Sequence, residues 1–371
     1  MIQYKKLIRF IVSIFLVVLV LESTCFFILN NFNLNGCYQK NNNSLIKIRE
    51  ILVNPDILNE YLRYIPQHSL AYMHNPNYIQ NGIKVNNSFG FRGSEIQLSK
   101  DNEAIRVICI GGSTTYGFLI DELSETYPYL LESKLQAKYP NKKIEVINAG
   151  LEAGSSIEEV MHYQFKIRYL NPDIVVLRTG GNDASNISEI SANYTPDMNF
   201  LYQELISIPT MNRKLKCLLK SNFISLLYIW LSYVNTYNEG ALRHGVPSRN
   251  VNLTKENWFR KNVESFFSGS KNYNFYQNYD LLTDLFIKDS VQFYSMPFLL
   301  NKNIEIDSLY YKLNTLNNSI MKDITTKKGV VWIQMSEEEF PLDCWLGDDC
   351  HYNYNGNKIL SKIVADSIKI N

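Results

Sequence analysis

Residues 105–115 read IRVICIGGSTT, and this stretch decides how the chain folds. The run from Arg106 to Ile110 is short and almost continuously apolar, as expected for a strand buried on both faces of a parallel sheet. The two glycines that follow allow a tight turn and a close approach of a ligand to the backbone. Ser113 therefore stands at the carboxyl end of a strand, the edge at which open α/β sheets bind their ligands.

The same alternation of strands and helices continues along the chain. The expected strands are 106–110, 144–147, 173–177, 291–294 and 330–333, and the expected helices are 125–139, 156–170, 276–288, 307–323 and 356–368. This order predicts a three-layer α/β/α domain with a mostly parallel sheet over residues 105–371. An insertion at about 188–270 interrupts it. Within the insertion, Arg213–Val234 has helical spacing and is expected either to pack on the core or to form a lid or membrane-surface helix.

An apolar segment precedes this domain. Phe10–Leu29 carries one charge, Glu22, and is long enough to span the lipid bilayer as a helix. Three basic residues lie within 1–9, so the positive-inside rule places that end in the cytoplasm and the body of the chain outside it, in the periplasm. A cleaved signal peptide is the alternative, but the apolar run lacks a small-residue cleavage site. Residues 30–104 are expected to form a stalk and a lead-in to the domain, with helical spacing over 44–64.

Composition and cysteine placement narrow the possible partners. Lys and Arg (37) balance Asp and Glu (36), so no net positive field favours a nucleic acid. Among the six cysteines, Cys344 and Cys350 bracket a short loop, which outside the cytoplasm predicts a disulfide. A metal site that uses both with His351, or two free thiols, are the alternatives. The chain has no second C-x-x-C pair to complete a tetrahedral site, so we expect no metal and no cofactor.

Three further segments place polar groups at the predicted sheet edge. The third strand ends in Gly180-Gly181-Asn182-Asp183, where the Asn182 amide can face a developing oxyanion or simply serve a turn. The second strand ends in Asn148–Ser156, whose small residues leave backbone N–H groups free. Near the C-terminus, an Asp three residues before His351 can orient its imidazole. Ser113 itself is expected to act as a nucleophile or as the N-cap of the next helix.

These segments, in this order, resemble the four conserved blocks of the SGNH (GDSL-type) hydrolase superfamily. GGST at 111–114 resembles the first block, the region of residues 153 and 154 the second, GGND at 180–183 the third and D-x-x-H at 348–351 the fourth. The preceding VNNSFGFRG at 85–93 resembles the lead-in of membrane-anchored members encoded among bacterial surface-polysaccharide functions. The resemblance covers about residues 105–370 and implies a flavodoxin-like sheet.

The resemblance also assigns roles to single residues. It implies that Ser113 attacks an acyl carbonyl, that His351 accepts the serine proton and that Asp348 orients His351. Asp349 is a rival for that last role, although its position next to Cys350 and His351 gives it poor reach.

An oxyanion hole is implied as well. Its expected donors are the N–H of Ser113, a backbone N–H at Ala153 or Gly154, and the Asn182 side chain. The chain departs from the pattern at Gly112, where the family usually has Asp, and in the second block, where the glycine comes one residue late. These departures leave the choice between Ala153 and Gly154 open.

The function expected from this resemblance is that of an extracytoplasmic serine esterase that removes O-acyl groups, above all O-acetyl, from a cell-surface glycan. An O-acyltransferase that uses the same acyl-enzyme is one alternative. A non-catalytic glycan-binding or assembly protein on the same scaffold is another. The other histidines, at 68, 74, 162 and 244, are expected to be structural.

Overall fold

The computed structural model describes residues 2–31, 63–66, 72–76, 78–80, 82–190, 221–227 and 273–370. The chain divides into two compact units, which are Met1–Ile65 with Phe200–Asn250 and Pro66–Asn199 with Val251–Asn371. The second unit contains the central sheet and all the residues predicted to carry the chemistry.

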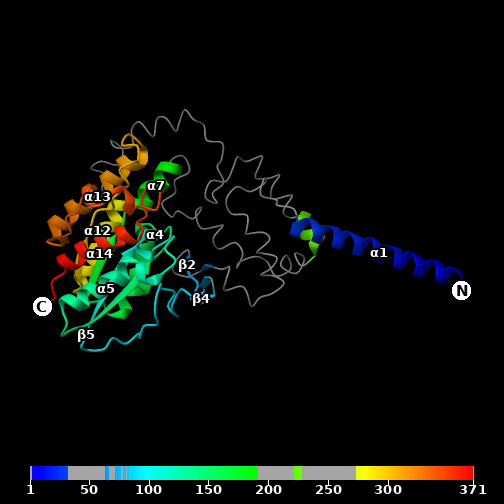
Figure 1. The fold of residues 1–371 in the computed structure, drawn as a ribbon, viewed down its shortest axis with the longest axis horizontal. Helices are drawn as coiled ribbons and strands as arrows, with labels where there is room; N and C mark the ends of the chain where they lie inside the picture. Colours follow the sequence, from blue (N-terminus) through cyan, green and yellow to red (C-terminus); the bar gives the residue numbers. More distant parts are fainter. Residues whose placement is uncertain are drawn as a thin grey trace. The chain divides into compact units, whose positions relative to one another are not determined.

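Within the described residues, five parallel strands form the central sheet in the order β6-β5-β7-β8-β9. Figure 1 shows this sheet, in which β5 is labelled, among its helices. Of these five strands, β5 comes first in the chain, and it lies between the second, β6, and the third, β7. Such an order creates a switch point between β5 and β7, where open α/β sheets bind ligands. The mostly parallel, flavodoxin-like sheet predicted above is confirmed. The strands are β5 (Ala104–Gly111), β6 (Lys143–Gly150), β7 (Ile174–Arg178), β8 (Gln292–Ser295) and β9 (Val331–Trp332).

Helices cover both faces of this sheet. Successive strand residues point to opposite faces, so each strand contributes side chains to two apolar clusters. Val107 and Cys109 pack into the cluster that contains α5 and α14, whereas Ile108 and Ile110 pack into the cluster that contains α6, α12 and α13. The helices are α4 (Ser113–Tyr116), α5 (Tyr127–Lys138), α6 (Ser156–Phe165), α7 (Gly181–Ile190), α12 (Asn274–Lys288), α13 (Leu309–Lys328) and α14 (Tyr354–Ser367). Short 3₁₀ turns are η3 (Leu123–Glu125), η4 (Ile167–Leu170), η5 (Glu337–Glu339) and η6 (Leu342–Cys344).

The helix bounds differ from the predicted ones mainly at two places. The helix expected at 156–170 ends at Phe165 and continues as η4, because Lys166 leaves helical geometry with φ −140°. Helix α13 runs past the predicted residue 323 to Lys328 and is capped by Gly329, whose φ of 68° suits glycine. The helix predicted over 44–64 lies almost wholly outside the described residues, and of the predicted helix 213–234 the structure describes 221–227, of which 222–227 are helical.

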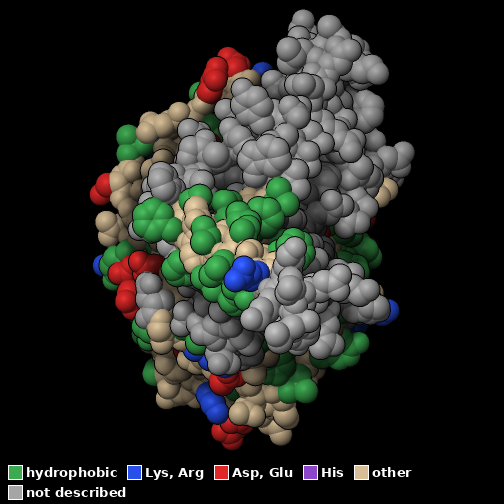
Figure 2. Space-filling view, turned by 90° about the vertical axis from the view of Figure 1, so that its right-hand side faces the viewer, with side chains coloured by type: hydrophobic (Ala, Val, Ile, Leu, Met, Phe, Trp, Pro, Cys, Tyr) green, Lys and Arg blue, Asp and Glu red, His purple; other side chains and the backbone are tan. Residues whose placement is uncertain are grey.

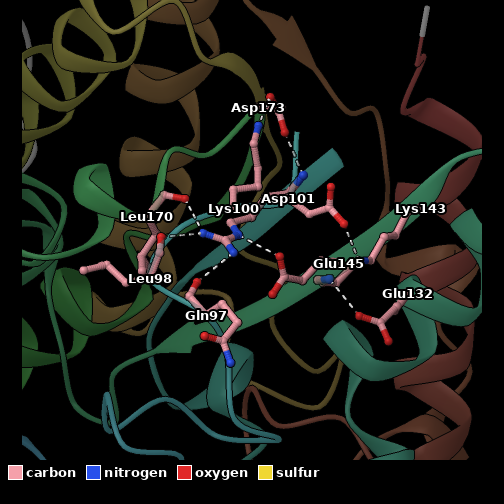
Figure 3. A network of polar contacts seen from close by, with 11 residues as sticks. Gln97, Leu98, Lys100, Asp101, Glu132, Lys143, Glu145, Leu170 and Asp173 are labelled. Carbon is pink, nitrogen blue, oxygen red and sulfur yellow. Dashed lines mark hydrogen bonds and ion pairs between the residues drawn. The ribbon is translucent and has the colours of Figure 1, made fainter. Parts of the chain in front are cut away.

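A polar network fixes the amino ends of the first three strands (Figure 3). The guanidinium of Arg106, buried in β5, lies 2.8 Å from the Glu145 carboxylate of β6 and donates to the carbonyls of Gln97 (2.9 Å) and Leu170 (2.5 Å). The Arg106 backbone N–H donates to the Asp173 carboxylate at 2.7 Å. Because these bonds hold β5, β6 and the approach to β7 at one end, the opposite ends meet in a defined register.

Four short strands precede the sheet, namely β1 (Tyr64–Pro66), β2 (Tyr72–His74), β3 (Ile79–Gln80) and β4 (Ile83–Lys84). Strands β3 and β4 pair in antiparallel fashion. Two isolated antiparallel bridges follow, from Asn86 to Arg92 and from Arg92 to Asn148 at the end of β6. The segment that contains Asn86 and Arg92 therefore contacts the central sheet next to the predicted site.

The N-terminal helix belongs to the first unit. Helix α1 (Ile2–Asn31) contains the segment Arg9–Ile28, which has a mean hydropathy of 2.6 and is only 6% buried. Hydrophobic side chains gather near the centre of the view in Figure 2. By length and composition this helix suits a membrane span or a signal sequence. The Glu22 carboxylate accepts hydrogen bonds from the Ser221 hydroxyl and, at 2.7 Å, from the Asn222 N–H.

Candidate active site

Three of the predicted residues form a hydrogen-bonded chain at the carboxyl edge of the sheet. The Nε2 atom of His351 lies 2.9 Å from the hydroxyl oxygen of Ser113. The other ring nitrogen, Nδ1, lies 2.7 Å from a carboxylate oxygen of Asp348. The second oxygen of Asp348 accepts from the backbone N–H groups of His351 (2.8 Å) and Cys350 (3.1 Å). Asp348 is thus fixed by its own loop, and it fixes the imidazole in turn.

The charges in this chain follow from the same contacts. Burial acts to raise the pKa of Asp348, but hydrogen bonds and the charge of His351 outweigh it and lower the pKa. Burial likewise opposes the charged ring of His351, whose side chain is 13% exposed, yet Asp348 and Cys350 raise its pKa above the ordinary value. An ionised carboxylate only accepts, so Nδ1 carries a proton, and in the neutral form of the ring Nε2 is the nitrogen that can accept from Ser113.

Ser113 is the first residue of α4, and the N-cap is Gly112 without a side-chain capping bond. The prediction that Ser113 caps this helix is therefore wrong, because its hydroxyl faces His351 instead. The residue before the serine, Gly112, lies close to Asn182. A Cβ atom added at Gly112 would lie 2.6 Å from the amide nitrogen of Asn182, closer than real Cβ contacts come. Only glycine lets the Asn182 amide lie against the backbone that precedes the serine.

The loop after β6 distinguishes the two possible backbone donors. The N–H of Gly154 donates to the Leu151 carbonyl at 2.9 Å and is consumed by that turn. Among the hydrogen bonds of the described residues, the N–H groups of Ser113 and Ala153 have no acceptor. Ala153 has a φ of 58°, a left-handed conformation that glycine adopts more easily than alanine. The geometry thus favours Ala153 over Gly154 as the free donor.

Asn182 is the second residue of α7, at the end of β7. Its side-chain nitrogen donates to the Gly154 carbonyl at 2.7 Å, so one amide hydrogen braces the loop after β6. The other hydrogen remains for a ligand, because an amide nitrogen carries two. The next residue, Asp183, is buried and accepts from the hydroxyl (2.6 Å) and N–H (3.0 Å) of Ser156. Burial raises the pKa of Asp183 to about 6. These bonds tie the starts of α6 and α7 together.

The predicted disulfide is not formed, because Cys344 and Cys350 are free thiols. The Trp345–Tyr352 bridge closes the loop and places Cys344 in the apolar cluster under α14. The sulfur of Cys350 instead faces His351, 3.5 Å from Nδ1. The two sulfurs therefore belong to different surroundings, and the backbone bridge supplies the closure that the sequence spacing suggested a disulfide would supply.

A metal at the loop would compete with the hydrogen-bonded chain. Asp348, Cys350 and His351 each offer one ligand atom, and these atoms lie within 4.8 Å of one another. The nitrogen on this side of the ring is Nδ1, which already lies 2.7 Å from the carboxylate. A metal ion there would break the bond that orients the ring, so these residues fit a hydrogen-bonded triad better than a metal site.

Sequence reasoning missed two residues that fix the imidazole. Phe118, just after α4, lies beside the His351 ring with a centroid distance of 5.5 Å. Arg178, at the end of β7, is fully buried between the rings of Phe298 and Tyr352, 4.7 Å from each centroid. Tyr352 directly follows His351, so this cation–π stack holds the backbone behind the base. For Arg178, the indication in the sequence was an arginine in the last position of an otherwise apolar strand.

The remaining candidates lie elsewhere. His162 is buried in the fold, and burial keeps its pKa well below the ordinary value. His74 is buried and stacks on Tyr116. Asp349, the rival for the orienting role, is exposed and is held through its carbonyl, which accepts from the Asn301 N–H at 2.7 Å. Residues 68 and 244 lie outside the described residues.

Comparisons with known proteins give only a distant likeness. No protein-family model matches the chain, and no curated protein matches it. Among solved structures, the chain is similar to an acetyl xylan esterase, at 12% identity and a TM-score of 0.44, over 71% of this chain and 100% of that one. A catalytic mutant of an acetylxylan esterase from Geobacillus stearothermophilus gives 12% identity and a TM-score of 0.45 over 72% and 95% of the two chains. A lipase/acylhydrolase from Enterococcus faecalis gives 12% identity and a TM-score of 0.43, over 71% of this chain and 94% of that one. At this level of similarity the case for a function rests on the geometry of the site itself.

Proposed function

We propose that this chain is a serine esterase of the SGNH (GDSL-type) kind, which removes O-acyl groups through an acyl-enzyme on Ser113. One observation carries the proposal: His351 lies between Ser113 and Asp348, at 2.9 Å from the hydroxyl and 2.7 Å from the carboxylate. Both distances fall within the reach of about 2.6–3.2 Å that general-base catalysis requires. A serine activated in this way is the nucleophile of acyl transfer.

In the first half of the reaction, the Ser113 oxygen forms a bond to the acyl carbon while His351 Nε2 takes the hydroxyl proton. The tetrahedral intermediate collapses when the alkoxy leaving group accepts that proton from His351. In the second half, His351 deprotonates a water molecule that attacks the acyl-enzyme, and the proton then returns to the Ser113 oxygen as the acid leaves. Asp348 stabilises the protonated ring throughout and keeps Nδ1 as its donor.

The oxyanion of each intermediate would accept from three groups, the N–H of Ser113, the N–H of Ala153 and the second amide hydrogen of Asn182. They come from the ends of three neighbouring strands, β5, β6 and β7. Each such donor is typically worth about 2.7–4 kcal/mol in the transition state. Because Asn182 also braces the loop of Ala153 through Gly154, the donors are held before substrate arrives.

The leaving group is proposed to be a sugar of a cell-surface glycan. An open groove of about 480 Å³ lies beside the catalytic loop and is lined in part by Tyr354 and Leu119. Their side chains are 42% and 59% exposed, so the Tyr354 ring is open to stacking against a sugar ring and Leu119 offers apolar surface beside it. Asp121, Glu122 and Glu125 also line the groove and would repel a polyanionic chain, so a neutral or amino sugar fits best.

The site is proposed to lie outside the cytoplasm on a single anchor, residues 10–29. Support comes from the length and hydropathy of α1 and from the basic residues before it. A reporter fused to the C-terminus should then show its activity on the outer side of the cytoplasmic membrane and none in the cytoplasm. Activity of the reporter in the cytoplasm would overturn this topology.

The proposed activity is tested on the full chain in detergent, with a chromogenic acetyl ester and with acetylated neutral and anionic oligosaccharides. Free acetate and acylated acceptor are both followed, so that hydrolysis is separated from transfer to a sugar hydroxyl. The proposal expects turnover that Ser113→Ala abolishes, with an unchanged unfolding midpoint. Equal rates for the wild-type and Ser113→Ala chains would overturn it, and acylated acceptor as the main product would make the chain a transferase.

A further inference from the structure

The mechanism above makes no use of the segment before the sheet, here called the lead-in, which is made up of the described residues 72–76, 78–80 and 82–93. It contains the VNNSFGFRG sequence at 85–93 and the strand β2. It is nevertheless deeply packed, because Tyr72 has 0% exposed surface and Arg92 has 5%. Each of these two side chains ends on backbone atoms next to the proposed site, Tyr72 on the loop after β6 and Arg92 on the end of α4 and the turn that follows it.

Tyr72 holds the peptide that carries the proposed oxyanion donor. Its hydroxyl donates to the backbone carbonyl of Glu152, across 80 residues of sequence. That carbonyl belongs to the peptide group between Glu152 and Ala153, whose other polar atom is the Ala153 N–H. A trans peptide is planar and its C=O and N–H point in opposite directions. A bond that fixes the carbonyl on one side therefore aims the N–H toward the other.

This peptide needs an external restraint, because the loop conformation is unfavourable for its own sequence. Ala153 has a φ of 58°, a region that L-residues other than Gly, Asn and Asp seldom enter. The next residue, Gly154, donates its N–H to the Leu151 carbonyl and accepts from the Asn182 amide, but neither hydrogen bond involves the carbonyl of Glu152. Tyr72 is the described side chain that donates to that carbonyl. The hydroxyl thus opposes the rotation that an alanine at this position favours.

Arg92 makes the corresponding contact with the helix of the nucleophile. Its guanidinium donates to the carbonyls of Gly117 (2.6 Å) and Ile120 (2.5 Å), with longer contacts to Tyr116 (3.4 Å) and Asp121 (3.3 Å). These carbonyls lie at and beyond the end of α4, the helix that begins with the serine. The lead-in therefore touches the two backbone segments that would supply two of the three oxyanion donors.

We propose that the lead-in is a working part of the active site, in which Tyr72 is a positioning residue that aims the Ala153 N–H into the oxyanion hole. The proposal rests on the esterase function proposed above. Tyr72 touches no reacting atom and acts through the Glu152–Ala153 peptide. The lead-in, which precedes the hydrolase-like sequence blocks, is thereby assigned a role in the rate of ester hydrolysis, and not only in linking the N-terminal segment of the chain to the sheet.

The test compares Tyr72→Phe with Tyr163→Phe in the full chain. Tyr163 is a matched control, because its phenol is also fully buried and its hydroxyl donates to Asp289 at 2.8 Å. Tyr163 lies near the C-terminal end of α6, away from the catalytic loop. The kcat and KM for an acetyl ester are measured, together with the Ki of a small boronic acid, which forms a tetrahedral adduct with the serine. Unfolding midpoints report the structural cost of each lost hydroxyl.

Tyr72→Phe is expected to lower kcat about ten-fold, part of the 100- to 1,000-fold that loss of a whole oxyanion donor costs, with KM nearly unchanged. The Ki of the boronate should rise by the same factor, whereas Tyr163→Phe should change only the midpoint. If the two variants lose stability alike and both keep the wild-type kcat and Ki, Tyr72 is structural and this proposal is wrong. A wild-type chain that neither turns over esters nor binds the boronate would instead reject the esterase function itself.

Discussion

Replacing Asn182 by alanine removes the one side chain that serves the proposed oxyanion hole in two ways. Its amide braces the loop after β6 through the 2.7 Å bond to the Gly154 carbonyl, and its second hydrogen is available to the oxyanion. The loss of a direct donor alone corresponds to about 2.7–4 kcal/mol, or roughly 100- to 1,000-fold in kcat. Because the donor acts on charge that develops only in the transition state, KM should stay within about three-fold.

The control for this variant is Asn314→Ala, since the buried Asn314 amide likewise donates to a backbone carbonyl, that of Phe298, at 2.8 Å. Each substitution forfeits a hydrogen bond from a side-chain amide to a backbone carbonyl, at a cost of about 1–3 kcal/mol in stability, although the Phe298 carbonyl keeps a second donor, the Asn318 amide at 3.0 Å. Steady-state kinetics on an acetyl ester and thermal unfolding are measured for both variants. A kcat for Asn182→Ala within about five-fold of the wild type, at a stability loss equal to that of Asn314→Ala, would refute an oxyanion role.

Three further substitutions probe the rest of the site. Asp348→Asn removes the charge that raises the pKa of His351, so the acid limb of the pH profile of kcat/KM should move to lower pH while the plateau falls by roughly 100-fold or more; an unmoved limb would contradict the coupling. Gly112→Ala should displace the Asn182 amide, 2.6 Å from the new Cβ, and lower kcat by about ten-fold or more with little change in the unfolding midpoint, whereas unchanged kinetics would show that the amide is free to move. Cys350→Ser should keep kcat within about three-fold and remove one alkylatable thiol from unreduced protein, and a disulfide-linked peptide in the wild type would contradict the free-thiol state.

The sequence predicted the sheet well, because buried parallel strands carry a strong signal of their own. The strand expected at 106–110 is the core of β5, and the serine that follows it lies where the end of a parallel strand must put it. The approach of His351 to Ser113 across 238 residues followed from the order of the four sequence blocks rather than from any local pattern. The chain order alone cannot give that distance, since it depends on how α4 and the last loop meet.

Other features depended on backbone conformations that a sequence does not display. The choice between Ala153 and Gly154 turns on a φ of 58° and on a hydrogen bond that uses the Gly154 N–H. The cysteine spacing suggested a disulfide, but the loop is closed by a backbone bridge that sends the two thiols to different sides. The part played by Tyr72 was out of reach for the same reason, because a hydroxyl 80 residues from its acceptor leaves no pattern in the sequence.

The most direct test of the central claim is to react the full chain with a fluorophosphonate and to locate the adduct by peptide mass spectrometry. The account predicts a single phosphonylated residue, Ser113, formed in step with the loss of esterase activity. It also predicts that labelling is far slower in His351→Ala, because the serine then lacks its base. An adduct at another residue, or full esterase activity in protein phosphonylated at Ser113, would contradict the account.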